Sequence, residues 1–244
     1  MTFIRSVLFN LFYHVSTAVL ALAGVIVRRF APDRTHALAV TWARVELAAA
    51  RIICGIRLEV TGGEYLPRPG DGKPMGAALL ASRHESAFDT MVWLTLLPRA
   101  CYVLKIELTR IPLFGGMIRP SGMIPVDRAG GAAAMRELMR EGRRAAREDR
   151  QIVIFPEGTR GEPGTLLPLQ PGVAALAAAT RLPVIPVVTD SGRRWGRRAF
   201  RKYPGVIHIR VLPPLDAALS RGALMTELER VLRAGLATLE NDHA

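Results

Sequence analysis

The sequence predicts an α/β fold, with a mixed or mostly parallel β-sheet covered by helices on both faces. Two observations support this prediction. From residue 57 onward, short apolar runs alternate with longer helical patterns, which is typical of a sheet covered on both faces. The first 56 residues instead carry two long apolar helical stretches. We therefore predict a membrane-associated helical pair over residues 1–56 and an α/β domain over residues 57–244.

The first predicted helix covers residues 6–27, and Arg5, Arg28 and Arg29 flank it. About twenty apolar residues suffice to cross a bilayer. Arginines on both sides also suit a helix that lies in the interface. The competing interpretation is a cleavable signal peptide, because Ala21-Leu22-Ala23 resembles a cleavage site. We favour the membrane helix, because nothing downstream is typical of a secreted protein.

The second helical pattern covers residues 37–56 and has Trp42, Val45, Ala48 and Ile52 on a broad apolar face. Two interpretations remain open at this point. The helix could complete a hairpin on the membrane, or it could be an ordinary packed helix of the α/β domain.

The α/β domain is expected to start with a strand at residues 57–60 and a Gly- and Pro-rich loop at residues 61–74. Further strands are expected at residues 76–81, 101–104, 123–126, 152–155, 184–188 and 206–211. Helices are expected at residues 86–97, 132–148, 172–179 and 223–239. The helix at residues 132–148 has apolar residues on one side and charges opposite, so its arginines are interpreted as a solvated face.

The charge balance predicts an anionic partner. The chain has 33 Lys and Arg residues against 21 Asp and Glu, a net charge of +12, and its lysines are Lys73, Lys105 and Lys202. Phospholipid headgroups and nucleic acid are both candidates. Nucleic acid is not expected, because aromatic residues make up only 6% of the chain and no nucleic-acid-binding motif occurs. An anionic membrane surface is therefore the expected partner.

The two cysteines, Cys54 and Cys101, lie in apolar contexts without metal-ligand spacing. This pattern predicts buried thiols in a reducing compartment. We expect no metal site.

The candidate catalytic residues are His84 and Asp89, which follow the apolar run at residues 76–81. With His84 on the turn and Asp89 in the first turns of the next helix, the two side chains can meet. An aspartate that accepts a hydrogen bond from one ring nitrogen leaves the other nitrogen free to take a proton. A capped helix terminus is the alternative explanation. A zinc-protease motif is excluded because Phe88 stands where its second histidine is needed, and no Gly-x-Ser-x-Gly elbow occurs.

Cations follow two predicted strands. Lys105 comes directly after the strand at residues 101–104, and Arg128 follows the strand at residues 123–126. Strand ends that lie beside one another line the ligand crevice of an open α/β sheet, so these two cations could clamp a phosphate. Surface ion pairs with Glu107 and Asp127 are the alternative.

A third stretch follows the strand at residues 152–155 and contains Glu157, Gly158, Thr159 and Arg160. A glycine between an acid and an arginine lets the backbone approach a ligand, while the arginine forks onto phosphate oxygens. A tight turn would explain the glycine alone.

Together these stretches resemble the glycerolipid acyltransferase family. Four blocks agree in order and spacing: His84-x4-Asp89, residues 105–128, residues 155–160 and the strand at residues 182–187. The resemblance implies that His84 and Asp89 form the catalytic pair and that an amino-terminal two-helix module binds the membrane. It also implies that the phosphorylated acceptor is bound or positioned by Lys105, Arg128, Glu157, Gly158, Thr159 and Arg160. Two departures are Arg83, where the family often has Asn, and Gln170, where it commonly has Lys.

The resemblance implies lysophosphatidic acid as the acceptor and acyl-CoA or acyl-carrier protein as the donor, with no cofactor. The product would be phosphatidic acid for phospholipid synthesis. The expected location is the cytoplasmic face of a membrane, the inner membrane in a bacterium. The alternatives are another lysolipid acceptor, such as a lyso-ornithine lipid or a lysophospholipid, and a basic membrane-binding protein without enzymatic activity.

Overall fold

The computed structural model describes residues 1–67, 76–216 and 218–241. Within these residues, seven strands form one sheet in the order β1-β7-β6-β2-β5-β3-β4. The strands are β1 (Ile56–Thr61), β2 (Ala78–Ser82), β3 (Ala100–Lys105), β4 (Ile124–Val126), β5 (Gln151–Ile154), β6 (Val184–Thr189) and β7 (Gly205–Val211). All neighbouring strands are parallel except β6 and β7. The prediction of a mixed, mostly parallel sheet is confirmed.

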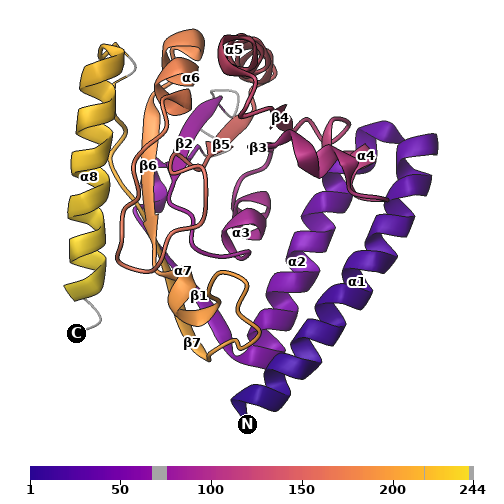
Figure 1. Ribbon diagram of the computed structural model, residues 1–244. Helices are drawn as coiled ribbons and strands as arrows, with labels where there is room; N and C mark the ends of the chain where they lie inside the picture. Colours follow the sequence, from indigo (N-terminus) through magenta and orange to yellow (C-terminus); the bar gives the residue numbers. More distant parts are fainter. Residues whose placement is uncertain (68–75, 217, 242–244) are drawn as a thin grey trace.

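Helices cover both faces of the sheet (Figure 1). They are α1 (Thr2–Phe30), α2 (Thr35–Cys54), α3 (Asp89–Leu96), α4 (Gly115–Ile118), α5 (Gly131–Arg147), α6 (Gly172–Thr180), α7 (Ser191–Arg194) and α8 (Arg221–Asn241). Short 3-10 turns occur at Pro32–Arg34, Gly63–Tyr65 and Ile106–Arg110. Neither these turns nor the short helices α4 and α7 were predicted from the sequence, because a single helical turn has no apolar periodicity.

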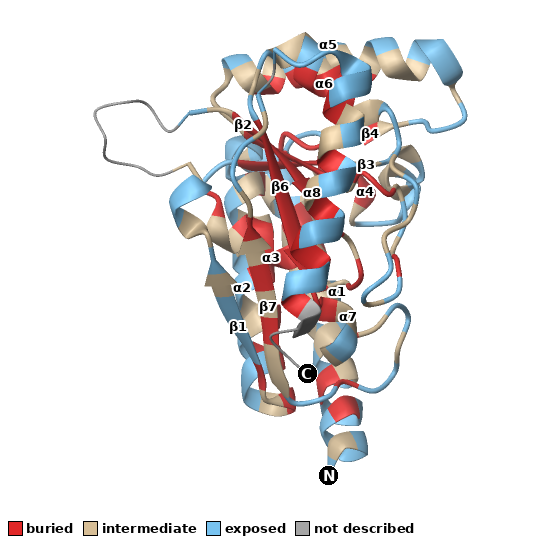
Figure 2. Ribbon diagram, turned by 90° about the vertical axis from the view of Figure 1, so that its left-hand side faces the viewer, coloured by how far each residue is buried: buried red, intermediate tan, exposed pale blue. Residues whose placement is uncertain are grey.

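The alternation of side chains along each strand builds two separate cores. Leu80 of β2 packs with α2 and α3 on one face of the sheet. Leu79, its neighbour in sequence, packs with α5, α6 and α8 on the other face. Figure 2 shows β2 and β6 buried along their lengths, whereas the edge strand β1 is largely exposed. Both cysteines are free and buried, as predicted.

The first two helices form a hairpin beside the sheet (Figure 1). The second helix also packs against α3, so residues 37–56 do form a packed helix of the α/β domain, and the position of the hairpin on a membrane stays a prediction. The predicted helix extended to Ile56, which is wrong: α2 ends at Cys54 because Gly55 adopts a left-handed conformation with φ 71°. Ile56 is instead the first residue of β1.

The first helix turns an apolar face outward. Of the helices in the described residues, α1 is the one that is long and apolar enough to cross a membrane, and its most apolar part is only 11% buried. A signal sequence would pass the same test. The exposed large apolar residues on this helix include Ile4, Leu8, Leu11, Val15, Val19, Leu22 and Ile26. Their spacing of three or four residues makes one continuous stripe.

Two boundaries near the candidate site differ from the prediction. The strand predicted at residues 76–81 runs from Ala78 to Ser82. The helix predicted at residues 86–97 starts at Asp89, because the Asp89 carboxylate accepts the backbone N–H groups of Glu85 and Ser86 and holds them in a turn. Residues 68–74 of the loop predicted at residues 61–74, including Lys73, lie outside the described residues.

Candidate active site

The site is organised around the connection from β2 to α3, which carries His84. The Nδ1 atom of His84 lies 3.0 Å from Oδ2 of Asp89. The same oxygen accepts the N–H groups of Glu85 at 2.7 Å and Ser86 at 2.8 Å. Because Asp89 is the first residue of α3, the turn and the helix start hold the carboxylate in place. The arrangement favours the His84 tautomer with hydrogen on Nδ1, which leaves Nε2 free to accept a proton.

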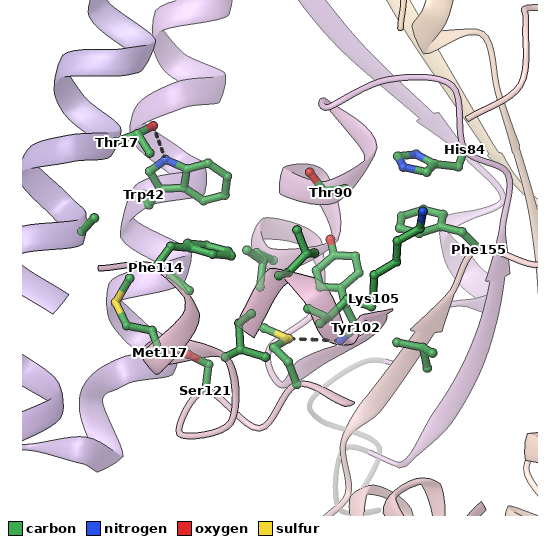
Figure 3. Close-up of a pocket in the computed structure, with 18 of the residues that line it drawn as sticks. Thr17, Trp42, His84, Thr90, Tyr102, Lys105, Phe114, Met117, Ser121 and Phe155 are labelled. Carbon is green, nitrogen blue, oxygen red and sulfur yellow. Dashed lines mark hydrogen bonds between the residues drawn. The ribbon is translucent and has the colours of Figure 1, made fainter. Parts of the chain in front are cut away.

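An aromatic stack fixes the plane of the His84 ring. Phe155, which follows β5, stacks on the imidazole with ring centroids 4.0 Å apart. Tyr102 of β3 stacks on the other side of Phe155, with centroids 6.0 Å apart. The Tyr102 hydroxyl also donates a hydrogen bond to the Asp89 carbonyl at 3.4 Å. Residues of β3 and of the segment after β5 therefore hold both members of the His84–Asp89 pair, and Figure 3 shows Phe155 and Tyr102 beside His84.

His84 opens onto a cavity of about 680 Å³. In Figure 3, His84, Phe155 and Lys105 lie at one end, and Trp42, Phe114 and Met117 lie at the other, next to α1 and α2. Apolar residues form most of the wall away from His84, among them Leu20, Leu38, Trp42, Leu94, Leu108, Phe114, Met117 and Ile118. The cavity is therefore polar beside the histidine and apolar at its far end, which suits a ligand with a charged head and an alkyl tail.

The three predicted cations all line this cavity. Lys105 ends β3 and lies beside Val126 in the β3–β4 register, and Arg128 follows two residues later. The Arg160 Nε atom donates to Nε2 of His84 at 3.3 Å. Asp and Glu side chains are absent from the lining formed by the described residues. The cations thus face the cavity without acidic partners there, as an anion site requires.

Gly158 and Thr159 also line the cavity. Gly158 adopts φ 71°, a conformation that favours glycine, and its carbonyl accepts a hydrogen bond from Arg128. The backbone turn at this glycine therefore carries both the Arg128 contact and the following Arg160.

Glu157 is placed differently from the other predicted residues. Its carboxylate is buried and accepts the backbone N–H groups of Leu167 at 2.9 Å and His84 at 3.4 Å. It does not line the cavity. The sequence pattern located this residue in the right loop, but its carboxylate faces the interior and supports the backbone of His84.

Arg83, the first departure from the family pattern, precedes His84 and is fully buried. Its guanidinium donates to Glu85 at 2.6 Å and to the carbonyl of Glu162 at 2.7 Å, and it also bonds the carbonyl of Thr165. Its Nε atom lies 3.7 Å from the Glu157 carboxylate. Arg83 therefore joins the His84 turn to the loop that carries Arg160. Burial raises the pKa of Glu85 to about 8, against the attraction of Arg83.

Sequence reasoning missed several residues of the cavity. Tyr13 and Trp42 reach it from the helical hairpin, and Arg197 and Arg198 reach it from the connection between α7 and β7. These residues lie outside the four blocks in the sequence. No local spacing signals them, because only the packing of the hairpin and of β7 brings them to the cavity.

Comparisons with known proteins agree with this geometry. Residues 57–190 match the family model described as Acyltransferase. A 1-acyl-sn-glycerol-3-phosphate acyltransferase of Pseudomonas aeruginosa is 31% identical over 88% of this chain and 81% of its own length. The mouse 1-acyl-sn-glycerol-3-phosphate acyltransferase alpha is 30% identical over 71% of this chain and 60% of its own length.

The fold is also that of a solved structure. The crystal structure of the 1-acyl-sn-glycerophosphate (LPA) acyltransferase PlsC from Thermotoga maritima has a TM-score of 0.76 with 21% identity, and the match covers 98% of both chains. The sequence blocks, the matched family model and the shared fold lead to the same conclusion. The chain belongs to the acyltransferase family.

Proposed function

We propose that this acyltransferase moves an acyl chain from a thioester donor to the 2-hydroxyl of 1-acyl-glycerol-3-phosphate, giving phosphatidic acid. One observation carries the proposal: the His84 imidazole, held by Asp89, opens onto a cavity that is cationic beside it and apolar farther away. The names of the relatives from Pseudomonas aeruginosa and mouse support this acceptor.

In the proposed mechanism, Nε2 of His84 removes the proton from the acceptor hydroxyl. The oxygen then attacks the thioester carbonyl, the carbon–sulfur bond breaks, and the proton on His84 passes to the departing thiolate. A thioester is already activated, so the mechanism needs no covalent enzyme intermediate. Asp89 stabilises the imidazolium that forms between these two proton transfers.

The cations position the acceptor. The acceptor phosphate carries about −1.5 to −2 charges near neutral pH, and Lys105, Arg128 and Arg160 supply the opposite charge around the cavity. Arg160 contacts Nε2 of His84. The acceptor hydroxyl must take that place, which releases the guanidinium to bind the phosphate. The apolar end of the cavity then receives an acyl chain.

The experiment is an acyl-transfer assay with purified protein, a panel of lysolipids and both acyl-CoA and acyl-carrier protein as donors. We expect lysophosphatidic acid to be acylated at the 2-hydroxyl, and lysolipids without a phosphate monoester to react poorly. Preferred acylation of lyso-ornithine lipid or lysophosphatidylcholine would replace the proposed acceptor. An absence of transfer from either donor to any of these lipids would contradict the proposal.

We also propose that α1 attaches the protein to the cytoplasmic face of an anionic membrane. The exposed apolar stripe of α1 and the net charge of +12 support this location. Salt screens only the charge contribution, so the intact protein should stay on vesicles at high salt. The triple variant Leu11→Glu, Val15→Glu and Leu22→Glu should be released, whereas Leu219→Glu, exposed elsewhere, should not. Salt alone releasing the intact protein would contradict attachment through the stripe.

A further inference from the structure

The connection between α7 and β7 adds a second group of cations to the cavity. Arg197 and Arg198 both line the cavity and are exposed. They lie beyond residue 190, where the match to the acyltransferase model ends. With Lys105, Arg128 and Arg160, they bring five cationic side chains to one cavity.

This connection is anchored firmly. The buried Lys202 ammonium donates to the side-chain oxygen of Asn10 at 2.5 Å and to the carbonyls of Ala199 and Phe200 at 3.1 Å each. Asn10 in turn donates to the Phe200 carbonyl at 3.0 Å. The segment that carries the two arginines is therefore attached to α1 by a small network of hydrogen bonds.

The backbone here is also unusual. Arg198 has φ 54°, and a non-glycine residue with positive φ is uncommon and energetically unfavourable. Such a conformation persists only where the surroundings impose it, and it often marks a binding site. In this case it directs the chain so that two consecutive arginines both reach the cavity wall.

The arginines follow one another outward from the reaction centre. Arg160 contacts Nε2 of His84 at 3.3 Å, and the Arg197 guanidinium donates to the Arg160 carbonyl at 3.5 Å. Among the described residues, none of Arg160, Arg197 and Arg198 forms an ion pair with a carboxylate. Burial lowers the pKa of Arg160, the charge of Asp89 opposes this shift, and the charges of Arg197 and Arg198 add to it. Arg197 and Arg198 therefore repel Arg160, and an anion bound between them would relieve this repulsion.

One phosphate monoester does not account for five cations. Its charge of about −1.5 to −2 is already matched by Lys105, Arg128 and Arg160. The surplus at Arg197 and Arg198 therefore indicates a second anionic group that is present in the same cavity but farther from His84. Acyl-CoA and acyl-carrier protein share such a group, because in both the thioester is linked through a pantetheine arm to a phosphate. The arm separates this phosphate from the reacting carbonyl, so the residues that bind the phosphate line the same cavity as His84 without contacting its ring.

We propose that Arg197 and Arg198 bind the phosphate at the end of the donor's pantetheine arm. This inference rests on the proposed function for its donor class, but not on the identity of the acceptor. The exposed position of both arginines suits a donor that arrives from water. A headgroup of the surrounding bilayer does not fit this position, because the two side chains line the cavity onto which His84 opens.

The test measures binding without acceptor, using detergent-solubilised full-length protein and stable thioether ligands. S-hexadecyl-phosphopantetheine should bind the wild type about tenfold more tightly than S-hexadecyl-pantetheine, since a charge-assisted hydrogen bond is lost with the phosphate. The double variant Arg197→Gln and Arg198→Gln should bind both ligands equally, with the affinity that the wild type shows for the ligand without phosphate. Arg201→Gln, on the same connection but outside the cavity lining, should keep the wild-type preference.

A double variant that keeps the phosphate preference would overturn the inference, and so would equal weakening toward both ligands. Loss of binding to phosphatidylglycerol vesicles with an unchanged phosphate preference would assign the arginines to the membrane surface instead. S-hexadecyl-CoA and S-hexadecyl acyl-carrier protein are added as further ligands. The donor that the protein uses should be the one whose affinity falls more in the double variant. Because no acceptor is present, failure to acylate lysophosphatidic acid would contradict the proposed function while leaving this result intact.

Discussion

Two histidine–aspartate pairs among the described residues have the same contact distance. Nδ1 of His84 lies 3.0 Å from Asp89, and Nδ1 of His208 lies 3.0 Å from Asp190. Both aspartates are buried, and both histidines are partly exposed. Asp190 follows β6 and also accepts the backbone N–H of His208 at 2.7 Å, so this second pair joins the antiparallel strands β6 and β7.

The pairs differ in what surrounds the other ring nitrogen. The His84 ring is stacked on Phe155, contacts Arg160 and lines the cavity, whereas His208 is not part of that lining. An oriented imidazole is therefore insufficient to identify a catalytic base. A neighbouring cavity with charges that match a substrate is what distinguishes His84.

Replacing the histidine of each pair should give the largest difference in turnover between the two pairs. His84→Ala removes the proposed proton acceptor and should lower turnover on the order of 10² to 10⁴. His208→Ala removes a contact between two strands and should lower stability by about 1 kcal/mol without changing turnover per folded molecule. Turnover and melting temperature measured on the same preparations check both expectations. A folded and fully active His84→Ala would exclude the proposed mechanism.

Replacing the aspartate of each pair should also lower turnover for the His84 pair and not for the His208 pair. Asp89→Asn removes the charge that stabilises the imidazolium and should reduce turnover at least ~10-fold. The double variant with His84→Ala should be scarcely worse than His84→Ala alone, because the carboxylate acts only through the histidine. Asp190→Asn should leave turnover unchanged.

Additive losses of turnover at positions 84 and 89 would mean that Asp89 acts independently of His84. Additive losses of stability with intact turnover would instead support the alternative in which both residues only cap a helix.

The first pair could be predicted from the sequence and the second could not. His84 and Asp89 are separated by one turn and one helix start, so local spacing brings them together. His208 reaches Asp190 only through the pairing of β7 with β6, and no spacing in the sequence encodes that register. Lys105 and Arg128 were also predictable, because Lys105 ends β3, Arg128 comes two residues after β4, and the two strands are parallel neighbours.

The role of a side chain was harder to predict than its location. Glu157 lies in the predicted loop, but the buried guanidinium of Arg83 and the N–H of Leu167 hold its carboxylate inside. That outcome depends on a three-dimensional contact with a residue 74 positions earlier in the chain. Arg197 and Arg198 likewise depend on the anchoring of Lys202 to α1. Long-range packing therefore decides which charged groups face the cavity.

The His84 pair also differs from the His208 pair in its contact with Arg160, which can be tested next. Arg160→Lys keeps the charge but loses the planar, bidentate donor group. We expect KM for lysophosphatidic acid to rise about tenfold, the equivalent of 1.4 kcal/mol, with KM for the donor nearly unchanged. Arg147→Lys, on the exposed side of α5, is the matched control and should behave as wild type. Equal changes in both KM values would place Arg160 outside the acceptor site.

The smallest expected effect concerns the buried charges beneath His84. Burial raises the pKa of Glu85 to about 8, whereas a glutamate in an unfolded chain titrates near 4.3. Between these values the folded protein binds more protons than the unfolded chain does. The free energy of unfolding contributed by Glu85 should therefore fall as pH rises through this window, by at most about 1.4 kcal/mol per pH unit.

Glu85→Gln removes this titration and keeps the size of the side chain, and its one carbonyl oxygen can accept the hydrogen bond of either Arg83 or the N–H of Gly192, which bind different oxygens of Glu85. Urea unfolding of the variant should therefore depend less on pH between about 4.3 and 8 than unfolding of the wild type. The variant should gain stability relative to the wild type as pH rises, because the wild type alone must bury an ionised carboxylate there. Glu229→Gln, on the exposed side of α8, should keep the wild-type slope. Parallel curves for wild type and Glu85→Gln would show that Arg83 keeps Glu85 ionised throughout, so that the charges beneath His84 form a permanent ion pair.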